Sequence, residues 1–293
     1  MSANGTITRL RSGDYEATIA SVGATLVALT FRGRDLIVPF DPDGRSDGYQ
    51  GAVLVPWPNR ITQARYAVGG VSLQLPVNEA ETGAALHGFG YAQDWQPEYI
   101  DDAEACWVLD LTPSEGYPFP VRCRVEYVLD ARHGLQIHVV GTNVGPVDAP
   151  FGASAHPYLT CGLRPVDEYT ITVPASAYLG ADERMVPTEL SAVDGTELDL
   201  RHPQVIGGRP VDHAYTGLPD AEWEVTLTHP HAGGVRLTSA APWVQVYTGE
   251  RLGRVGVAVE PMTCGPDAFN RQPEEVLLRP GESRSVEMKI SAL

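Results

Sequence analysis

Apolar and polar residues alternate with a period of two along much of this chain. The clearest run is VRCRVEYVLD at residues 121–130, and GLQIHVVGTNV at residues 134–144 follows it after a short turn. Such alternation places successive side chains on opposite faces of a β-strand. Residues 15–40 are rich in β-branched and aromatic residues, which favour strands, and glycines divide them into shorter pieces. The pattern therefore predicts a succession of strands and turns through most of the sequence.

Paired strands joined by tight turns are expected at two places. YAVGGVSLQL, residues 66–75, has the form of a hairpin with two adjacent glycines in its turn. Residues 222–239 form the second candidate, and further strands are expected at residues 243–249 and 255–260. The chain contains 30 glycines and 24 prolines, as many short strands joined by turns require.

Helical periodicity is almost absent, and the one short stretch that favours a helix is residues 272–278. No shift in composition or low-complexity linker marks a domain boundary, and no solenoid or propeller repeat is visible. We therefore expect a single domain over residues 1–293. Its fold class is all-β, with large twisted antiparallel sheets packed face to face and few short helices.

The net charge excludes several classes of partner. Lys and Arg together number 21 and Asp and Glu number 37, which gives a formal net charge of −16. Nucleic acids and anionic membranes bind through Lys and Arg that neutralise phosphates, so neither is an expected partner. The field also slows the approach of an anionic substrate, whereas a neutral small molecule is indifferent to it.

The cysteines and the chain's start favour a cytoplasmic protein. The opening MSANGTITRL is not typical of a signal peptide, and no apolar stretch approaches the roughly 18 residues of a membrane span. The cysteines are scattered and form no CxxC motif, so reduced and mostly buried thiols are expected and a structural zinc site is not. They are Cys106, Cys123, Cys161 and Cys264.

Two residues have settings that suit proton transfer. His156 lies in FGASAHPYLT among small residues, and Glu260 ends the apolar run at 255–259, at the mouth of a predicted buried strand. Burial raises the pKa of a carboxyl and a nearby arginine lowers it, and this balance can tune a base. A hydrogen-bonded core histidine and a structural carboxylate paired with an arginine are the alternative interpretations.

Further polar residues lie in turns: Asn59-Arg60 in VLVPWPNRI, His87 in ALHGFGYAQDW and Asp212 in RPVDHAYTGL. Each also has an ordinary structural or surface interpretation. Together they suit a site for a neutral polyol, which needs an acid, a base, hydrogen-bond donors and aromatic faces. Candidates for the aromatic faces, each of which also suits the core, are Trp57, Trp95, Tyr158 and Trp243. Phosphate-binding glycine loops, GxSxG and HExxH are absent from the sequence.

Six motifs occur in an order that resembles the aldose 1-epimerase (galactose mutarotase) family. They are PWPNRI, LHGFGYAQDW, TNVGPVDAPFGASAHPYL, VDHAY, VQVYTG and VEPMTCGPDAFN. The resemblance runs from about residue 15 to the end of the chain. It implies a β-supersandwich fold and interconversion of the α- and β-anomers of a free hexose without a cofactor. No cluster of ligands in the sequence suggests a catalytic metal. Two of the motifs are similar to a bacterial branch that includes sulfoquinovose mutarotases.

The resemblance also implies roles for individual residues. Glu260 matches the general base that removes the anomeric hydroxyl proton, and His156 matches the general acid that protonates the ring oxygen. The sugar-binding positions correspond to Asn59, Arg60, His87, Tyr158, Asp212 and Gln245. We expect the charge of Glu260 to raise the pKa of His156, so that the imidazole sets the basic limb of a bell-shaped pH profile.

Two other functions stay open. One is a mutarotase for an anionic sugar such as sulfoquinovose, which needs a cationic group besides Arg60. The other is a non-catalytic carbohydrate-binding protein on the same fold, against which the presence of both an acid and a base argues. A hexose-6-phosphate epimerase is disfavoured, because Arg60 and Arg65 are the only basic residues near the first motif. The expected partner is a monosaccharide, and the protein itself is expected to be a monomer or homodimer.

Overall fold

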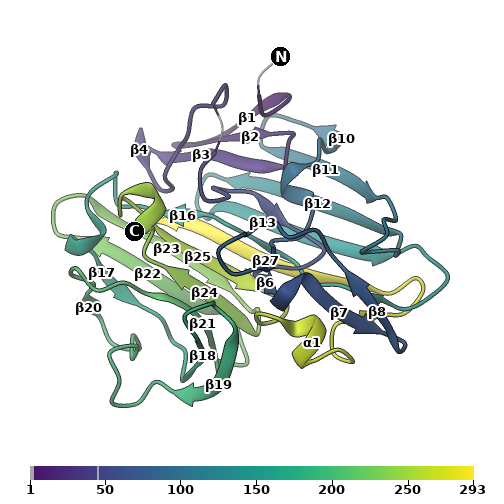
Figure 1. The fold of residues 1–293 in the computed structure, drawn as a ribbon. Coiled ribbons are helices and arrows are strands. Elements are labelled where there is room, and N and C mark those ends of the chain that lie inside the picture. The colour runs from purple at the N-terminus through teal and green to yellow at the C-terminus, as the bar shows by residue number, and fades with distance from the viewer. Residues whose placement is uncertain (1–2, 45) are drawn as a thin grey trace.

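The computed structural model describes residues 3–44 and 46–293, and most of their regular structure is β-strand (Figure 1). Nine strands form one large antiparallel sheet. In order across the sheet they are β10 (Gln96–Ile100), β11 (Glu104–Leu111), β12 (Val121–Asp130), β13 (Gly134–Asn143), β27 (Ser283–Ala292), β23 (Gly233–Ser239), β22 (Trp223–His229), β17 (Thr170–Thr172) and β20 (Gln204–Val205).

A second, six-stranded antiparallel sheet carries much of the site described below. Its strands, in order, are β16 (Tyr158–Leu159), β25 (Val257–Met262), β24 (Trp243–Tyr247), β21 (Asp212–Thr216), β18 (Ala177–Ala181) and β19 (Pro187–Ala192). A four-stranded sheet near the N-terminus contains β1 (Ile7–Ser12), β2 (Tyr15–Ala20), β3 (Thr25–Phe31) and β4 (Arg34–Asp35).

Four two-stranded pairs complete the β-structure of the described residues. They are β5 (Val53–Leu54) with β15 (Ser154–Ala155), β6 (Arg60–Ile61) with β9 (Ala85–Leu86), β7 (Arg65–Val68) with β8 (Val71–Gln74), and β14 (Ala149–Pro150) with β26 (Leu277–Leu278). The β7–β8 and β22–β23 hairpins confirm the two that the sequence predicts.

The alternating pattern of β12 determines how the large sheet packs. Its apolar residues at odd-numbered positions from 121 to 129 are buried, and the polar residues between them are intermediate or exposed. The C-terminal β27, yellow in Figure 1, pairs with β13 on one side and with β23 on the other. One continuous apolar cluster includes residues from Leu10 to Ile290. The all-β prediction is therefore confirmed, whereas the single domain stays a prediction.

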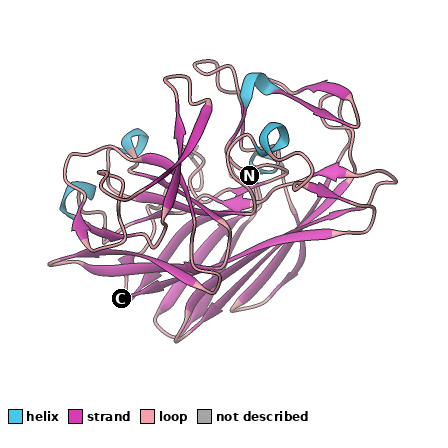
Figure 2. Ribbon diagram, turned by 90° about the horizontal axis from the view of Figure 1, so that it is seen from below, coloured by secondary structure: helices cyan, strands magenta, loops and turns pink. Residues whose placement is uncertain are grey.

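Helical structure is confined to short turns (Figure 2). The described residues contain one α-helix, α1 (Ala268–Arg271), and four 3₁₀ turns, at Thr62–Ala64, Gly90–Ala92, Val166–Glu168 and Glu250–Leu252. The helix predicted at residues 272–278 is wrong. Gln272 precedes Pro273, and a residue before proline avoids the helical conformation, so the helix ends at Arg271.

Candidate active site

Strand register brings three of the predicted site residues together. Glu260 of β25 lies directly opposite Gln245 of β24, and Gln245 lies opposite Ala214 of β21. Asp212 precedes Ala214 by two residues, so both are on the same face of the strand. The Gln245 amide donates a hydrogen bond to Asp212 Oδ1 at 2.6 Å and accepts one from Asn59 Nδ2 at 3.2 Å. The sheet thus supplies a polar floor of Glu260, Gln245 and Asp212, and Asn59, from the turn before β6, extends the hydrogen-bonded chain.

His156 is fixed between β15 and β16. Its backbone N–H donates to the Ala52 carbonyl at 3.0 Å, and its own carbonyl accepts from the Gly51 N–H at 2.8 Å. The Tyr158 ring stacks on the imidazole with ring centres 4.9 Å apart. Because the Tyr158 hydroxyl donates to the Gly48 carbonyl at 3.0 Å, this tyrosine holds the histidine in place as well as lining the site.

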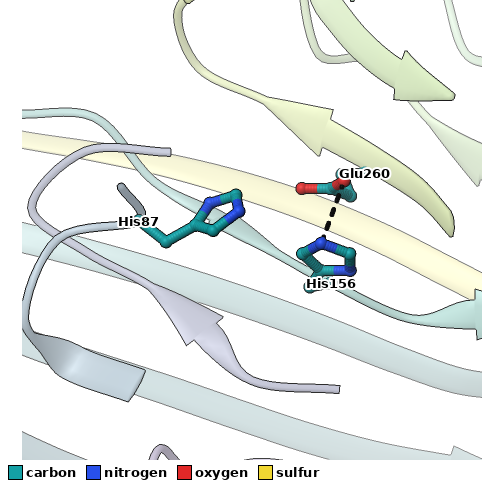
Figure 3. A group of neighbouring side chains, drawn as sticks. All are labelled: His87, His156 and Glu260. Carbon is teal, nitrogen blue, oxygen red and sulfur yellow. Dashed lines mark ion pairs between the residues drawn. The ribbon is translucent and has the colours of Figure 1, made fainter. Parts of the chain in front are cut away.

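His156 and Glu260 form a buried pair, with His156 Nε2 3.4 Å from Glu260 Oε1 (Figure 3). The two residues are 5% and 2% exposed. Within residues 3–44 and 46–293, His156 Nδ1 and Glu260 Oε2 have no hydrogen-bond partner. Buried polar atoms are nearly always paired, so two unpaired ones in one place point to a ligand that supplies the missing hydrogen bonds.

Burial controls the protonation of this pair. Desolvation raises the pKa of the Glu260 carboxyl well above its ordinary value, Asp212 adds to the increase, and Arg60 opposes it. Desolvation also lowers the pKa of His156 to about 3. The expectation that Glu260 raises the pKa of His156 is therefore wrong, because the dry site penalises the imidazolium. Burial therefore favours the uncharged form of each residue, a carboxylic acid at Glu260 and a neutral imidazole at His156.

His87 faces the pair from a tight turn (Figure 3). Its Nδ1 accepts a hydrogen bond from the Asn59 backbone N–H at 3.1 Å, so the neutral ring carries its proton on Nε2. The turn needs Gly88, which has φ +70° and whose added Cβ would lie 2.1 Å from the Val55 carbonyl oxygen.

Two histidines and a carboxyl within 4.8 Å of one another are also the donor set of many metal sites. A metal ligand must offer a lone pair, but the free nitrogen of His87 carries the ring proton. Burial lowers the pKa of His87 well below its ordinary value, with smaller contributions from His156, Arg60 and Arg251, so the ring is neutral and has the single N–H at Nε2. His87 is therefore better suited to donate a hydrogen bond than to bind a metal ion.

All eight predicted site residues line one pocket. The predicted residues in its wall are Asn59, Arg60, His87, His156, Tyr158, Asp212, Gln245 and Glu260. Residues 200 positions apart in the sequence therefore converge on one cavity that contains an acid, a base and several fixed donors.

The sequence model of the family described as aldose 1-epimerase matches residues 6–291. The chain belongs to the aldose 1-epimerase family. It is 42% identical over 283 residues to the uncharacterized protein YihR of Escherichia coli K12, covering 96% of this chain and 92% of that protein. It is also 30% identical to the galactose mutarotase of Rattus norvegicus, over 94% of this chain and 90% of the relative.

Solved structures share the fold of this aldose 1-epimerase family member. The GalM/aldose epimerase homologue of C. elegans superimposes with a TM-score of 0.87 at 20% identity, covering 98% of this chain and 99% of that one. The galactose 1-epimerase of Lactobacillus acidophilus gives a TM-score of 0.83 at 18% identity, covering 100% and 96%. At these identities the likeness establishes the fold alone.

The aromatic faces of this family member's pocket differ from those considered in the sequence. Trp57 and Trp95 are core residues whose indole N–H groups donate to backbone carbonyls, and Trp243 lines a separate hollow. Tyr158 does line the pocket, together with Tyr49 and Tyr247. The ring of Tyr49 packs edge-on against His87, with centroids 4.7 Å apart.

Sequence reasoning missed Tyr49, Glu79, Tyr247 and Arg251, which also line the pocket. Tyr49 has φ +59°, a rare conformation for an aromatic residue, and such conformations concentrate at functional sites. The sequence gives no signal for that backbone angle. Glu79 and Arg251 lie outside the six motifs, and only the folded loops bring them to the pocket.

Proposed function

We propose that this protein is an aldose 1-epimerase that interconverts the α- and β-anomers of a free neutral hexose. The observation that carries the proposal is the buried His156–Glu260 pair, 3.4 Å apart and short of hydrogen-bond partners, in a pocket lined by polar side chains. The family membership of the chain supports it. Such a pair can move a proton on and off a sugar without a cofactor.

In the proposed reaction Glu260 accepts the proton of the anomeric hydroxyl while His156 gives a proton to the ring oxygen. The C1–O5 bond breaks, C1 becomes an aldehyde and O5 becomes a hydroxyl. Rotation about C1–C2 then presents the other face of the aldehyde. Closure reverses both transfers, so the two residues exchange acid and base roles and no proton is gained or lost overall.

The uncharged pair that burial favours already carries the single proton that this cycle needs. Ring opening requires ionised Glu260 and protonated His156, whereas burial favours the uncharged pair. The charged and uncharged pairs differ only in which residue holds the proton, and the two atoms that exchange it, His156 Nε2 and Glu260 Oε1, lie 3.4 Å apart. A sugar hydroxyl donating to Glu260 and a ring oxygen accepting from His156 both favour the charged arrangement, so substrate binding shifts the pair toward its reactive form.

The remaining wall residues bind the sugar in this proposal. His87 presents Nε2–H as a donor, and Arg60 presents the guanidinium N–H groups that its ion pair does not use. The Asn59–Gln245–Asp212 chain holds each amide in one orientation. Polar groups held in advance in this way favour one mode of sugar binding.

Fresh α-D-glucose and α-D-galactose in a polarimeter test the proposal. Added protein should speed the approach to anomeric equilibrium well above the spontaneous rate, without changing the equilibrium rotation. Sugar binding without acceleration would instead identify a carbohydrate-binding protein. If the protein neither binds these sugars and other free aldoses nor speeds their mutarotation, the proposal is refuted.

Arg251 favours a second candidate, a mutarotase for an anionic sugar such as sulfoquinovose. The residue is exposed and lines the pocket, and no carboxylate of the described residues lies within 4.0 Å of its guanidinium. Arg254, three residues later, is paired with both Asp167 and Glu250. An unpaired arginine at a sugar pocket can bind a sulfonate or carboxylate at C6. Against this, the chain's net charge of −16 slows the approach of an anion.

The variant Arg251→Met separates the two candidates. If the substrate is anionic, the natural protein turns over a 6-sulfonated hexose better than glucose, and Arg251→Met lowers kcat/KM about tenfold for the sulfonated sugar alone. If the substrate is neutral, the kcat/KM of the variant for glucose stays within about twofold of that of the natural protein. The sulfonated sugar is then the poorer substrate for both proteins. One-dimensional exchange NMR at anomeric equilibrium measures both sugars under the same conditions.

We also propose a cytoplasmic compartment and a monomeric or homodimeric assembly. All four cysteines are free and buried, which supports the reducing, cytoplasmic compartment that the sequence predicts. No helix among the described residues has the length and apolar character needed to cross a membrane. A monosaccharide is the proposed partner, and size-exclusion chromatography with light scattering distinguishes a monomer from a homodimer.

A further inference from the structure

Arg60 is held by one carboxylate in a two-pronged ion pair. Its Nε donates to Glu79 Oε2 at 2.6 Å and its Nη2 donates to Glu79 Oε1 at 2.7 Å. The side chains are 14% and 5% exposed, and both residues line the pocket. The Thr82 hydroxyl adds a hydrogen bond to Glu79 Oε2. Paired donors of this kind fix the plane of a guanidinium as well as its position.

Arg60 has other carboxyl groups within electrostatic reach. Burial disfavours its charge, but hydrogen bonding and attraction to Glu79, with further attraction to Asp212 and Glu260, raise its pKa overall. Within residues 3–44 and 46–293, Glu79 is nevertheless the one carboxylate that forms an ion pair with Arg60 within 4.0 Å. A buried arginine without this partner would be an uncompensated charge, so pairing with another carboxylate would be strongly favoured.

We propose that Glu79 is a positioning residue that holds the Arg60 guanidinium away from Glu260, so that Glu260 stays free to exchange its proton with the sugar. The inference rests on the proposed function. Without Glu79, Arg60 turns toward Asp212 and Glu260, and a salt bridge to Glu260 stabilises its ionised form. The carboxyl then loses basicity and is blocked by the guanidinium at the same time.

The ionisation of Glu79 suits this role. Burial alone would raise the pKa of its carboxyl, but hydrogen bonds from Arg60 and Thr82, and the charges of Arg60 and Arg251, lower it overall. The two carboxyl groups thus shift in opposite directions: the pKa of Glu79 is lowered, whereas burial raises that of Glu260. The contrast directs the guanidinium to the ionised partner, because an arginine pairs more strongly with a charged carboxylate than with a neutral one.

Carbon-13 NMR titration of the Glu260 carboxyl tests the proposal without relying on turnover. The signal is assigned by its absence in Glu260→Gln. In Glu79→Gln the proton affinity of Glu260 should fall about tenfold, which is one pKa unit. The same change in an Arg60→Met background should leave Glu260 unmoved, because Glu79 acts through Arg60. Asp199→Asn, which weakens the distant Arg201–Asp199 pair, is the control and should not shift the signal.

Mutarotation kinetics provide the second readout. Glu79→Gln should lower kcat/KM at neutral pH by about 10²-fold, the cost expected of a misplaced group, and should move the basic limb of the pH profile to lower pH. A fall in activity with the Glu260 titration unchanged would overturn the proposal, since it would show a merely structural role.

If Glu79→Gln fails to fold, Thr82→Val serves as the second variant. It removes the hydrogen bond from Thr82 to Glu79 and should lower the pKa of Glu260 by a smaller amount. No shift in any folded variant also overturns the proposal. If the natural protein has no mutarotase activity, the proposed function fails. The NMR titration still tests whether Glu79 controls the pKa of Glu260.

Discussion

The strand-built floor of the pocket and its loop-built rim differ in how the chain fixes them. Glu260 and Gln245 lie on neighbouring strands, and every residue of β25 is buried, so the sheet hydrogen bonds set their positions. Three rim residues, Tyr49, Asn59 and His87, have positive φ angles between 56° and 62°. The floor is thus held by regular structure and the rim by strained turns.

This difference suggests separate functions for the two regions, proton transfer for the floor and sugar binding for the rim. A buried floor shifts the pKa values of His156 and Glu260, the groups that we propose transfer protons. A rim built on loops can change without disturbing the core, and binding specificity commonly resides in such segments. Substitutions in the floor should therefore affect the chemical step, and substitutions in the rim should affect sugar binding.

The largest effect is expected from Glu260→Gln in the floor. The amide keeps the shape of the side chain but cannot take the anomeric proton, so kcat should fall by at least about 10²-fold. Sugar affinity, measured by isothermal titration calorimetry, should change little. Polarimetry with fresh α-D-glucose measures the rate.

Near-UV circular dichroism controls for the fold of this variant. The buried Glu260 Oε2 has no protein partner to lose among the described residues, so the amide should be accommodated. A folded variant with near-normal kcat would remove Glu260 from the mechanism.

The pH profile of the natural protein should show the next largest effect. The active form carries one proton on the His156–Glu260 pair. Because the pKa of Glu260 is raised, the pair keeps that proton to higher pH than an ordinary carboxyl would, and above this point kcat/KM should fall tenfold per pH unit. The acid limb should lie near pH 3, where a second proton reaches His156.

A comparison of two histidine variants shows which group controls this profile. His156→Asn should lower kcat by about 10²-fold, since it removes the acid, whereas His87→Asn removes a hydrogen-bond donor and should mainly raise KM. Stopped-flow polarimetry from pH 4 to pH 9 gives both constants, and the natural protein should show only its basic limb within this range. Equal losses of kcat in the two variants would contradict the separate roles of His156 and His87.

The sequence predicted the residues of the floor more completely than those of the rim. The period-two pattern predicted β12 with its exact bounds, and the motifs led to Glu260 and His156, because both lie in segments whose local composition is unusual. Glu79 and Arg251 were missed, since their proximity to the pocket depends on loop conformations that no local pattern records. The direction of the His156 pKa shift was also missed. Burial causes it, and burial comes from residues distant in the sequence.

The smallest effect is expected from Arg60→Lys at the rim. Arg60 uses Nε and Nη2 to bind both oxygens of Glu79, which leaves its remaining N–H groups for the sugar. A lysine keeps the charge but has a single flexible ammonium, so it cannot hold Glu79 and the sugar in the same plane. KM should rise roughly tenfold while kcat falls less, because the floor stays intact. Initial rates over a range of glucose concentrations separate the two constants. Unchanged kcat and KM would make Arg60 a structural residue, whereas a loss of kcat as large as that of Glu260→Gln would show that the rim takes part in proton transfer and that the two regions act as one.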